Sequence, residues 1–218
     1  MPLFDMHSGE AFDPGAFLTW VVALALGITV HEFGHAWRAE KAGDPTPRAA
    51  GRMSINPLDH YDPLGSTLIL LVGFGWAKPV PTNPAMFRHP RRDEIMVSLW
   101  GPLANIITAL ILAVPLWLGV AGAYSVPIVY VIRLQLVLAV FNLIPVYPLD
   151  GSHILSALLP VDKARRLDAV YRQYGMFLLL GVLLVAGPVI WTVVRLLLMA
   201  ILSVGPALEA LVGLLTGG

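Results

Sequence analysis

The sequence contains no cysteine, and only 13% of its 218 residues are charged. Without cysteine there can be no disulfide bond, iron–sulfur cluster or thiolate nucleophile, and any transition-metal site has to use histidine, aspartate and glutamate. Basic and acidic residues number 14 each. Because the net charge is zero and no basic stripe is present, the composition argues against nucleic-acid binding.

Long stretches of the chain carry no charge, and 57% of the residues are hydrophobic. This content is too high for an ordinary soluble domain, and a helix needs about 20 apolar residues to cross the hydrocarbon core of a bilayer. We therefore predict an all-α integral membrane protein surrounded by membrane lipid. About four spanning helices are expected, near residues 16–41, 93–118, 127–146 and 175–202, the last with a kink at Gly187 and Pro188.

The region between the first two spanning helices is rich in proline, glycine, asparagine and aspartate. This composition predicts short β elements and turns between residues 44 and 83 rather than long helices. Within it, residues 64–74 are apolar but too few to cross a membrane, so we expect a re-entrant or interfacial segment. The chain shows no internal repeat and is expected to form one domain over residues 1–218, with a C-terminal helical segment at about 173–218.

All lysine and arginine residues lie at or beyond Arg38, and most fall in three clusters at residues 38–52, 78–92 and 163–172. Cytoplasmic loops of membrane proteins carry an excess of these two residue types. The pattern predicts a multi-pass protein of the cell membrane, with its N-terminus outside and its three basic loops in the cytoplasm.

Residues 31–35, His-Glu-Phe-Gly-His, form the pattern HExxH at the inner end of the first predicted helix. Residues four apart differ by only about 40° around a helix, so His31 and His35 project from one face and can bind one zinc ion. Glu32 lies beside them, where it can take a proton from a water. The alternative is a chance match in which both histidines only hydrogen-bond neighbouring helices. Against it stands the cost of a charged acid inside a span, roughly 2.5 to 3.5 kcal/mol, which makes such groups functional by default.

Two histidines leave a catalytic zinc site one protein ligand short. Asp150 is the candidate, because it follows a helix that runs from outside to inside and so arrives at the cytoplasmic depth of His31. Pro145 and Pro148 predict irregular backbone before it, which is tolerated at membrane depth only where it is buried in protein or lines a water-filled cavity. The alternative is that residues 148–151 merely turn the chain and that Asp150 caps the element that follows.

Three motifs in this order, HEFGH at residues 31–35, GPLAN at 101–105 and NLIPVYPLDG at 142–151, resemble those of the site-2 proteases, a family of intramembrane zinc metalloproteases. The stretches SINPLDHYDPLG and GWAKPVPTNP resemble its bacterial branch without a PDZ domain. The resemblance covers about residues 17–160, which would be the catalytic core. It implies one zinc ion per chain, bound by His31, His35 and Asp150. It also implies Glu32 as the catalytic base and acid, and a transmembrane protein or peptide as substrate. The predicted helix directions put the active site towards the cytoplasm.

Two asparagines belong to the same motifs. Asn105 and Asn142 are predicted to contact the oxyanion or the substrate backbone, although ordinary hydrogen bonds between helices would look the same in sequence. Two other functions remain open. One is a catalytically inert membrane-binding protein of the same fold. The other is a polytopic transporter, against which the lack of inverted repeats argues.

Overall fold

A computed structural model describes residues 13–72 and 75–207, which form helices joined by turns. The elements are α1 (Pro14–Ala42), α2 (Thr46–Ala49), η2 (Pro57–His60), α3 (Gly65–Val72), η3 (Pro84–Met86), α4 (Pro90–Trp117), η4 (Gly122–Tyr124), α5 (Ser125–Asn142), α6 (Asp150–Leu158) and α7 (Val161–Leu202). Helices α1, α4, α5 with η4, and α7 are long and apolar enough to cross a membrane. The described part of the chain is therefore all-helical with four helices of membrane length, as predicted.

The prediction of short β elements between the first two long helices was wrong. No residue that the structure describes lies in a strand. Residues 75–83 instead form irregular backbone in which Pro79 and Pro81 have no N–H, and the N–H of Val80 between them donates to the Glu32 carboxylate. The composition was right in excluding long helices here. It was wrong in suggesting strands, because a strand needs a partner ladder that prolines interrupt.

Helix α1 has clear start and stop signals. The Asp13 side chain accepts hydrogen bonds from the backbone N–H groups of Gly15 and Ala16, which have no partner inside the helix. At the other end Gly43 adopts a φ of 106°, the left-handed conformation that glycine takes without strain. The 29 residues between these caps make a helix about 44 Å long at 1.5 Å per residue, which exceeds the thickness of the hydrocarbon core.

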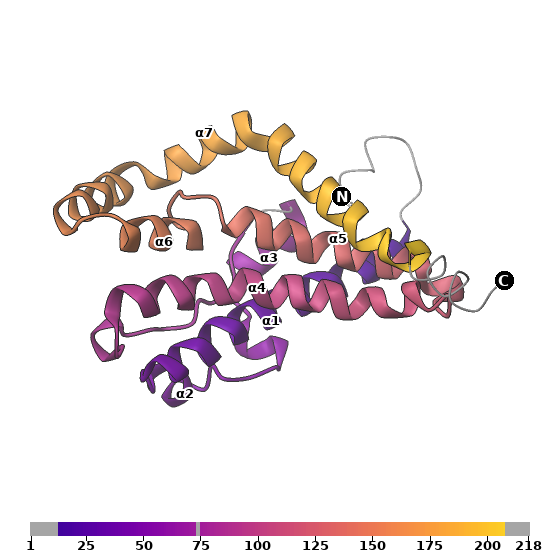
Figure 1. Ribbon diagram of the computed structural model, residues 1–218, viewed down its shortest axis with the longest axis horizontal. Coiled ribbons are helices and arrows are strands. Elements are labelled where there is room, and N and C mark those ends of the chain that lie inside the picture. Colours follow the sequence, from indigo (N-terminus) through magenta and orange to yellow (C-terminus); the bar gives the residue numbers. More distant parts are fainter. Residues whose placement is uncertain (1–12, 73–74, 208–218) are drawn as a thin grey trace.

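Helices α1, α4 and α5 pack against one another and form the centre of the molecule (Figure 1). Helix α5 ends at Asn142, before the predicted 146, because the following turn contains Pro145 and Pro148. Small side chains on α4, Ala109 and Ala113, meet larger ones on α5 and α7 in a buried apolar cluster. The other members of this cluster are Ile132, Leu136, Val194 and Ile201.

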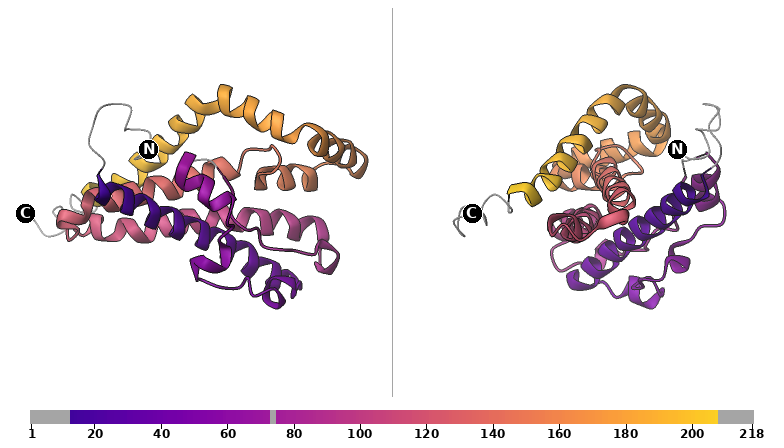
Figure 2. Two further views of the ribbon diagram at one scale, coloured as in Figure 1. Left: turned by 180° about the vertical axis from the view of Figure 1, so that it is seen from behind. Right: turned by 90° about the vertical axis from the view of Figure 1, so that its right-hand side faces the viewer.

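Helix α7 begins at Val161, well before the predicted start at 175. The prediction took the first residue of the uncharged run as the start of the helix. The basic cluster at residues 163–172 is in fact the first part of the same helix. Pro188 lies inside α7, and Figure 1 shows the helix bent along its course. In the end-on view of Figure 2, α1 and α7 lie on opposite sides of α4 and α5. The part of the C-terminal segment beyond residue 207 lies outside the described residues.

Helix α3 and the outer surface agree with a membrane setting. The eight residues of α3 extend for about 12 Å, too short to cross, as expected of a re-entrant or interfacial segment. Large apolar side chains on the long helices point outward, among them Leu18, Ile111, Val126 and Leu184, whose exposed fractions are 62%, 63%, 79% and 85%. Such a surface is covered by lipid rather than water in a multi-pass protein.

Candidate metal centre

Three side chains from two helices converge inside the bundle. His31 and His35 lie one turn apart on α1, and their Nε2 atoms are 3.1 Å apart. Asp150, the first residue of α6, places Oδ2 3.0 Å from His31 Nε2 and Oδ1 3.3 Å from His35 Nε2. The structure thus brings together the three residues that the sequence analysis predicted as ligands.

The hydrogen bonds of the two histidines determine which ring nitrogen faces this centre. His35 Nδ1 lies 2.7 Å from the carbonyl oxygen of Val97, which can only accept, so His35 Nδ1 carries the hydrogen. Asn105 Nδ2 donates to the carbonyl oxygen of Gly27, and Asn105 Oδ1 therefore faces His31 Nδ1 at 2.7 Å. His31 Nδ1 carries the hydrogen too. Both Nε2 atoms consequently present lone pairs to the centre.

This donor set fits a zinc ion. Two Nε2 lone pairs and one carboxylate face one another, and the buried Asp150 Oδ2 has no hydrogen-bond donor. Ligand bonds of about 2.0 to 2.1 Å in a tetrahedral zinc site put ligand atoms roughly 3.3 Å apart, close to the separations seen here. Three acceptors this close repel one another unless a cation, a metal ion or a proton, lies among them. Nitrogen and oxygen ligands with no sulfur are also those of catalytic rather than structural zinc sites.

Asp150 supplies the negative charge of the set. Its two oxygens lie 3.0 and 3.3 Å from the two Nε2 atoms, so a cation bound between the imidazoles is also next to the carboxylate. The residue at the cap position of α6 is Leu149, and no side-chain hydrogen bond caps that helix. The structure thus gives no support to the alternative in which Asp150 merely caps a helix.

Gly101 on α4 is a part of the site to which sequence reasoning assigned no role. A Cβ atom built at this position would lie 2.9 Å from His31 Cε1 and still closer to the ring of His35. Helix α4 can therefore approach the two imidazoles only with glycine here. The signal was present in the sequence as the first residue of the GPLAN motif, but the reason for it depends on how α4 packs on α1.

Replacing this glycine makes a direct test of the geometry. In Gly101→Ala the added methyl group competes for the space of the imidazoles, so we expect zinc content and any dependent activity to be lost. The helix itself should remain, since alanine favours helices over glycine by about 1 kcal/mol. The measurement is zinc per chain in detergent-purified protein. Gly181→Ala on α7 is the matched control, because a Cβ there meets nothing within 4 Å. Full zinc occupancy in Gly101→Ala would contradict this arrangement.

Glu32 follows His31 on α1 and is partly buried. Its Oε2 accepts the backbone N–H of Val80 at 3.0 Å. The flanking Pro79 and Pro81 have no N–H, so Val80 supplies the single backbone donor of this tripeptide to Glu32. Among the described residues Glu32 makes no other hydrogen bond, which leaves Oε1 available to accept a proton.

The two asparagines lie in different surroundings. Asn105 is fully buried behind His31, and its amide is engaged by His31, Gly27 and Gln135. Asn142 lies partly exposed at the end of α5, and its amide nitrogen donates to the Leu138 carbonyl of the same helix. An oxyanion or substrate contact stays a prediction for both. The sequence analysis missed Gln135, although a polar residue in an otherwise apolar stretch of a predicted span was the available signal.

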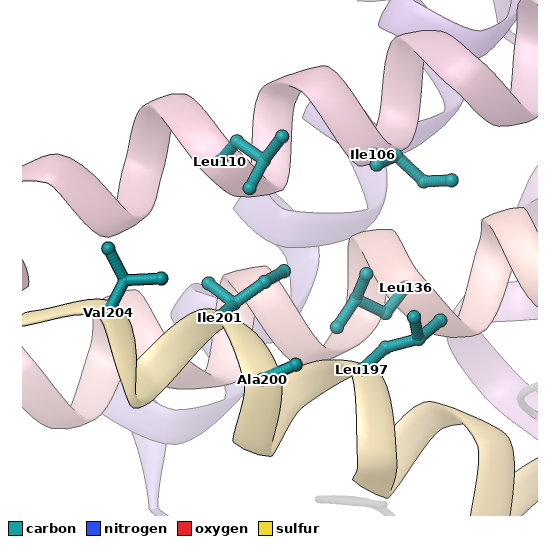
Figure 3. Close-up of a pocket in the computed structure, with 7 residues that line it drawn as sticks. All are labelled: Ile106, Leu110, Leu136, Leu197, Ala200, Ile201 and Val204. Carbon is teal, nitrogen blue, oxygen red and sulfur yellow. The ribbon is translucent and has the colours of Figure 1, made fainter. Parts of the chain in front are cut away.

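A separate pocket of about 300 Å³ lies between α4, α5 and the end of α7 (Figure 3). Aliphatic side chains line it, among them Leu110, Leu136 and Ile201. It contains no titratable or nucleophilic group and is therefore no candidate for chemistry.

Comparisons with known proteins agree with the geometry. The sequence profile of peptidase family M50 matches residues 118–186. The chain is 38% identical over 182 residues to "Putative zinc metalloprotease YwhC" of Bacillus subtilis (strain 168), an alignment that covers 78% of this chain and 83% of that protein. It is 32% identical over 184 residues to "Putative zinc metalloprotease Rip2" of Mycolicibacterium smegmatis, covering 78% and 68%. No solved structure matches the chain.

Proposed function

The chain belongs to peptidase family M50, and we propose that it is a zinc metalloprotease that hydrolyses a peptide bond in or near a transmembrane segment of another membrane protein. One observation carries this proposal. His31, His35 and Asp150 converge with lone pairs and a carboxylate facing one another, inside a bundle whose four long helices are apolar enough to span a membrane.

The depth of the metal centre supports cleavage within the membrane. His31 lies about 26 Å along α1 from its start at Pro14. If the hydrocarbon core, about 30 Å thick, begins near Pro14, His31 falls inside it, near its far side. With the N-terminus outside, as the basic clusters predict, the site opens towards the cytoplasm.

This orientation can be tested by labelling single cysteines. They should be labelled from outside at Gly122 and from inside at Ala50. Labelling of both from one side would contradict this orientation.

The site residues divide the chemistry between them. One zinc ion per chain, held by His31, His35 and Asp150, would supply a water that ionises near neutral pH and a positive charge beside the scissile carbonyl. Glu32 takes the proton as the water oxygen bonds to the carbonyl carbon. It then returns this proton to the amide nitrogen as the C–N bond breaks. One water is consumed, and no other reactant is required.

The substrate has to expose its backbone before this can happen, because the carbonyl groups of a transmembrane helix are hydrogen-bonded and covered. Residues 75–83 are irregular backbone that touches Glu32 through Val80. Pro79 and Pro81 have no N–H to donate, so an unwound substrate segment would pair with this backbone by donating its own N–H groups to the carbonyl oxygens here, with its scissile bond beside the metal centre. The contact with Glu32 is what favours residues 75–83 for this role.

The test uses the purified protein and a peptide that contains one transmembrane segment. We expect cleavage that stops when a chelator removes zinc and resumes when zinc is restored. A protein that holds one zinc ion and leaves such peptides uncut would favour an inert binding protein of this fold. A protein that binds no zinc would instead favour a transporter.

A further inference from the structure

We propose that Gln135, a residue of α5 that does not touch the metal centre, is a positioning residue for it. Its amide holds the Asn105 side chain in one orientation, and Asn105 in turn holds His31 in the tautomer that can bind a metal. This inference rests on the proposed function and concerns how the same site is built.

Gln135 is a fully buried amide in the middle of a membrane-length helix. A buried amide in apolar surroundings is costly unless its donors and acceptor are paired. The pairing here is specific: Gln135 Oε1 accepts a hydrogen bond from Asn105 Nδ2 at 2.7 Å, and Gln135 Nε2 faces the carbonyl oxygen of Ala23 at 3.5 Å. Gln135 thus connects α5 with both α4 and α1.

The direction of each hydrogen bond in this chain follows from two backbone carbonyls of α1. The carbonyl oxygens of Ala23 and Gly27 can only accept hydrogen bonds. The amide nitrogen of Gln135 therefore faces Ala23, and that of Asn105 faces Gly27. This leaves Gln135 Oε1 to accept from Asn105, and Asn105 Oδ1 to accept from His31 Nδ1. The hydrogen is thereby held on Nδ1 of His31, and Nε2 is left with its lone pair towards His35 and Asp150.

The packing around Gln135 leaves little freedom for other arrangements. A Cβ atom built at Gly27 would lie 3.2 Å from Gln135 Nε2 and closer still to the side chain of Leu138. Glycine at this position therefore lets α5 press its amide against the α1 backbone. Both hydrogens of Asn105 Nδ2 are used, one by Gly27 and one by Gln135. Without Gln135 Oε1, one hydrogen of Asn105 Nδ2 would be buried without an acceptor. The Asn105 amide would then no longer be held in one orientation.

A hydrogen bond that only holds the helices together would involve the same residues. The test therefore has to measure zinc affinity and not stability alone. The variant Gln135→Met keeps the volume and removes the acceptor, whereas Gln135→Glu keeps an acceptor oxygen in the same place. Gln173→Met, on the exposed surface of α7, is the matched control for the chemical change. Each protein is purified in detergent. Its dissociation constant for zinc is measured by competition with a chelator, and the thermal unfolding of its metal-free form is measured beside it.

We expect Gln135→Met to bind zinc about 10-fold more weakly or worse, in the range found when outer partners of metal ligands are removed. Gln135→Glu should keep an affinity close to the parent's, and Gln173→Met should match the parent. Should Gln135→Met fail to insert, Gln135→Ala removes the same acceptor with a smaller side chain.

Two outcomes would overturn the inference alone. The first is an unchanged zinc affinity in Gln135→Met, and if its metal-free form is also less stable, the hydrogen bond is purely structural. The second is an equal loss of zinc affinity in Gln135→Met and Gln135→Glu. If the parent itself binds no zinc, the proposed function and this inference fall together.

Discussion

Replacing Glu32 by glutamine leaves zinc bound and lowers peptide cleavage by about 100-fold or more, the range expected when a general base is lost. Glutamine has the shape of glutamate, and its amide oxygen can still accept the N–H of Val80. It cannot take a proton from water at neutral pH. The proposed ligands His31, His35 and Asp150 are untouched, so zinc content should stay at the parent's value while turnover of a transmembrane peptide falls.

The control for this variant is Glu40→Gln on the same helix. The Glu40 carboxylate pairs with Arg48 near the end of α1, so the substitution removes the same charge away from the metal centre. We expect Glu40→Gln to cleave at the parent's rate. Near-normal cleavage by Glu32→Gln, with zinc bound, would reject Glu32 as the base and would return weight to a non-enzymatic function.

Replacing Asp150 by asparagine removes zinc. Asparagine keeps the size of the side chain but has neither the charge nor the basicity of the carboxylate that faces the two imidazoles. Since outer partners of metal ligands are worth about 10- to 100-fold in affinity, the loss of a ligand should exceed about 100-fold. Zinc content and cleavage should fall together, while the protein still inserts into the membrane and unfolds cooperatively.

Asp162→Asn is the matched control, because Asp162 lies in the exposed first turn of the next helix, α7. It shares the helix-end position of Asp150 without the histidines, so this substitution should leave zinc in place. If Asp150 acted only through its helix, both variants would be nearly silent, since asparagine serves as well as aspartate at helix starts. Full zinc occupancy with normal activity in Asp150→Asn would reject the three-ligand site.

The regions where sequence and structure differ share one cause. Lack of charge locates the membrane-crossing part of α7 but not its start at Val161, because a helix continues through charged residues outside the lipid. Proline and glycine exclude long helices from residues 44–83, yet whether extended backbone becomes a strand depends on a partner elsewhere in the chain. Local composition determines what a segment can form, and its neighbours determine what it does form.

The sequence by itself determined the membrane class, the number of long helices and the pair of histidines on one helix face, because these depend on helix periodicity and on the length of uncharged runs. It also named Glu32 through the HExxH pattern, and Asp150 through the predicted direction of the helix before it and the order of the motifs. Only the tertiary structure decided the rest. That Gly101 must be glycine follows from α4 meeting both imidazoles, and that Gln135 reaches His31 through Asn105 follows from α5 packing on α1 and α4. No local pattern carries these relations, because each joins residues on different helices whose distance is set by packing alone.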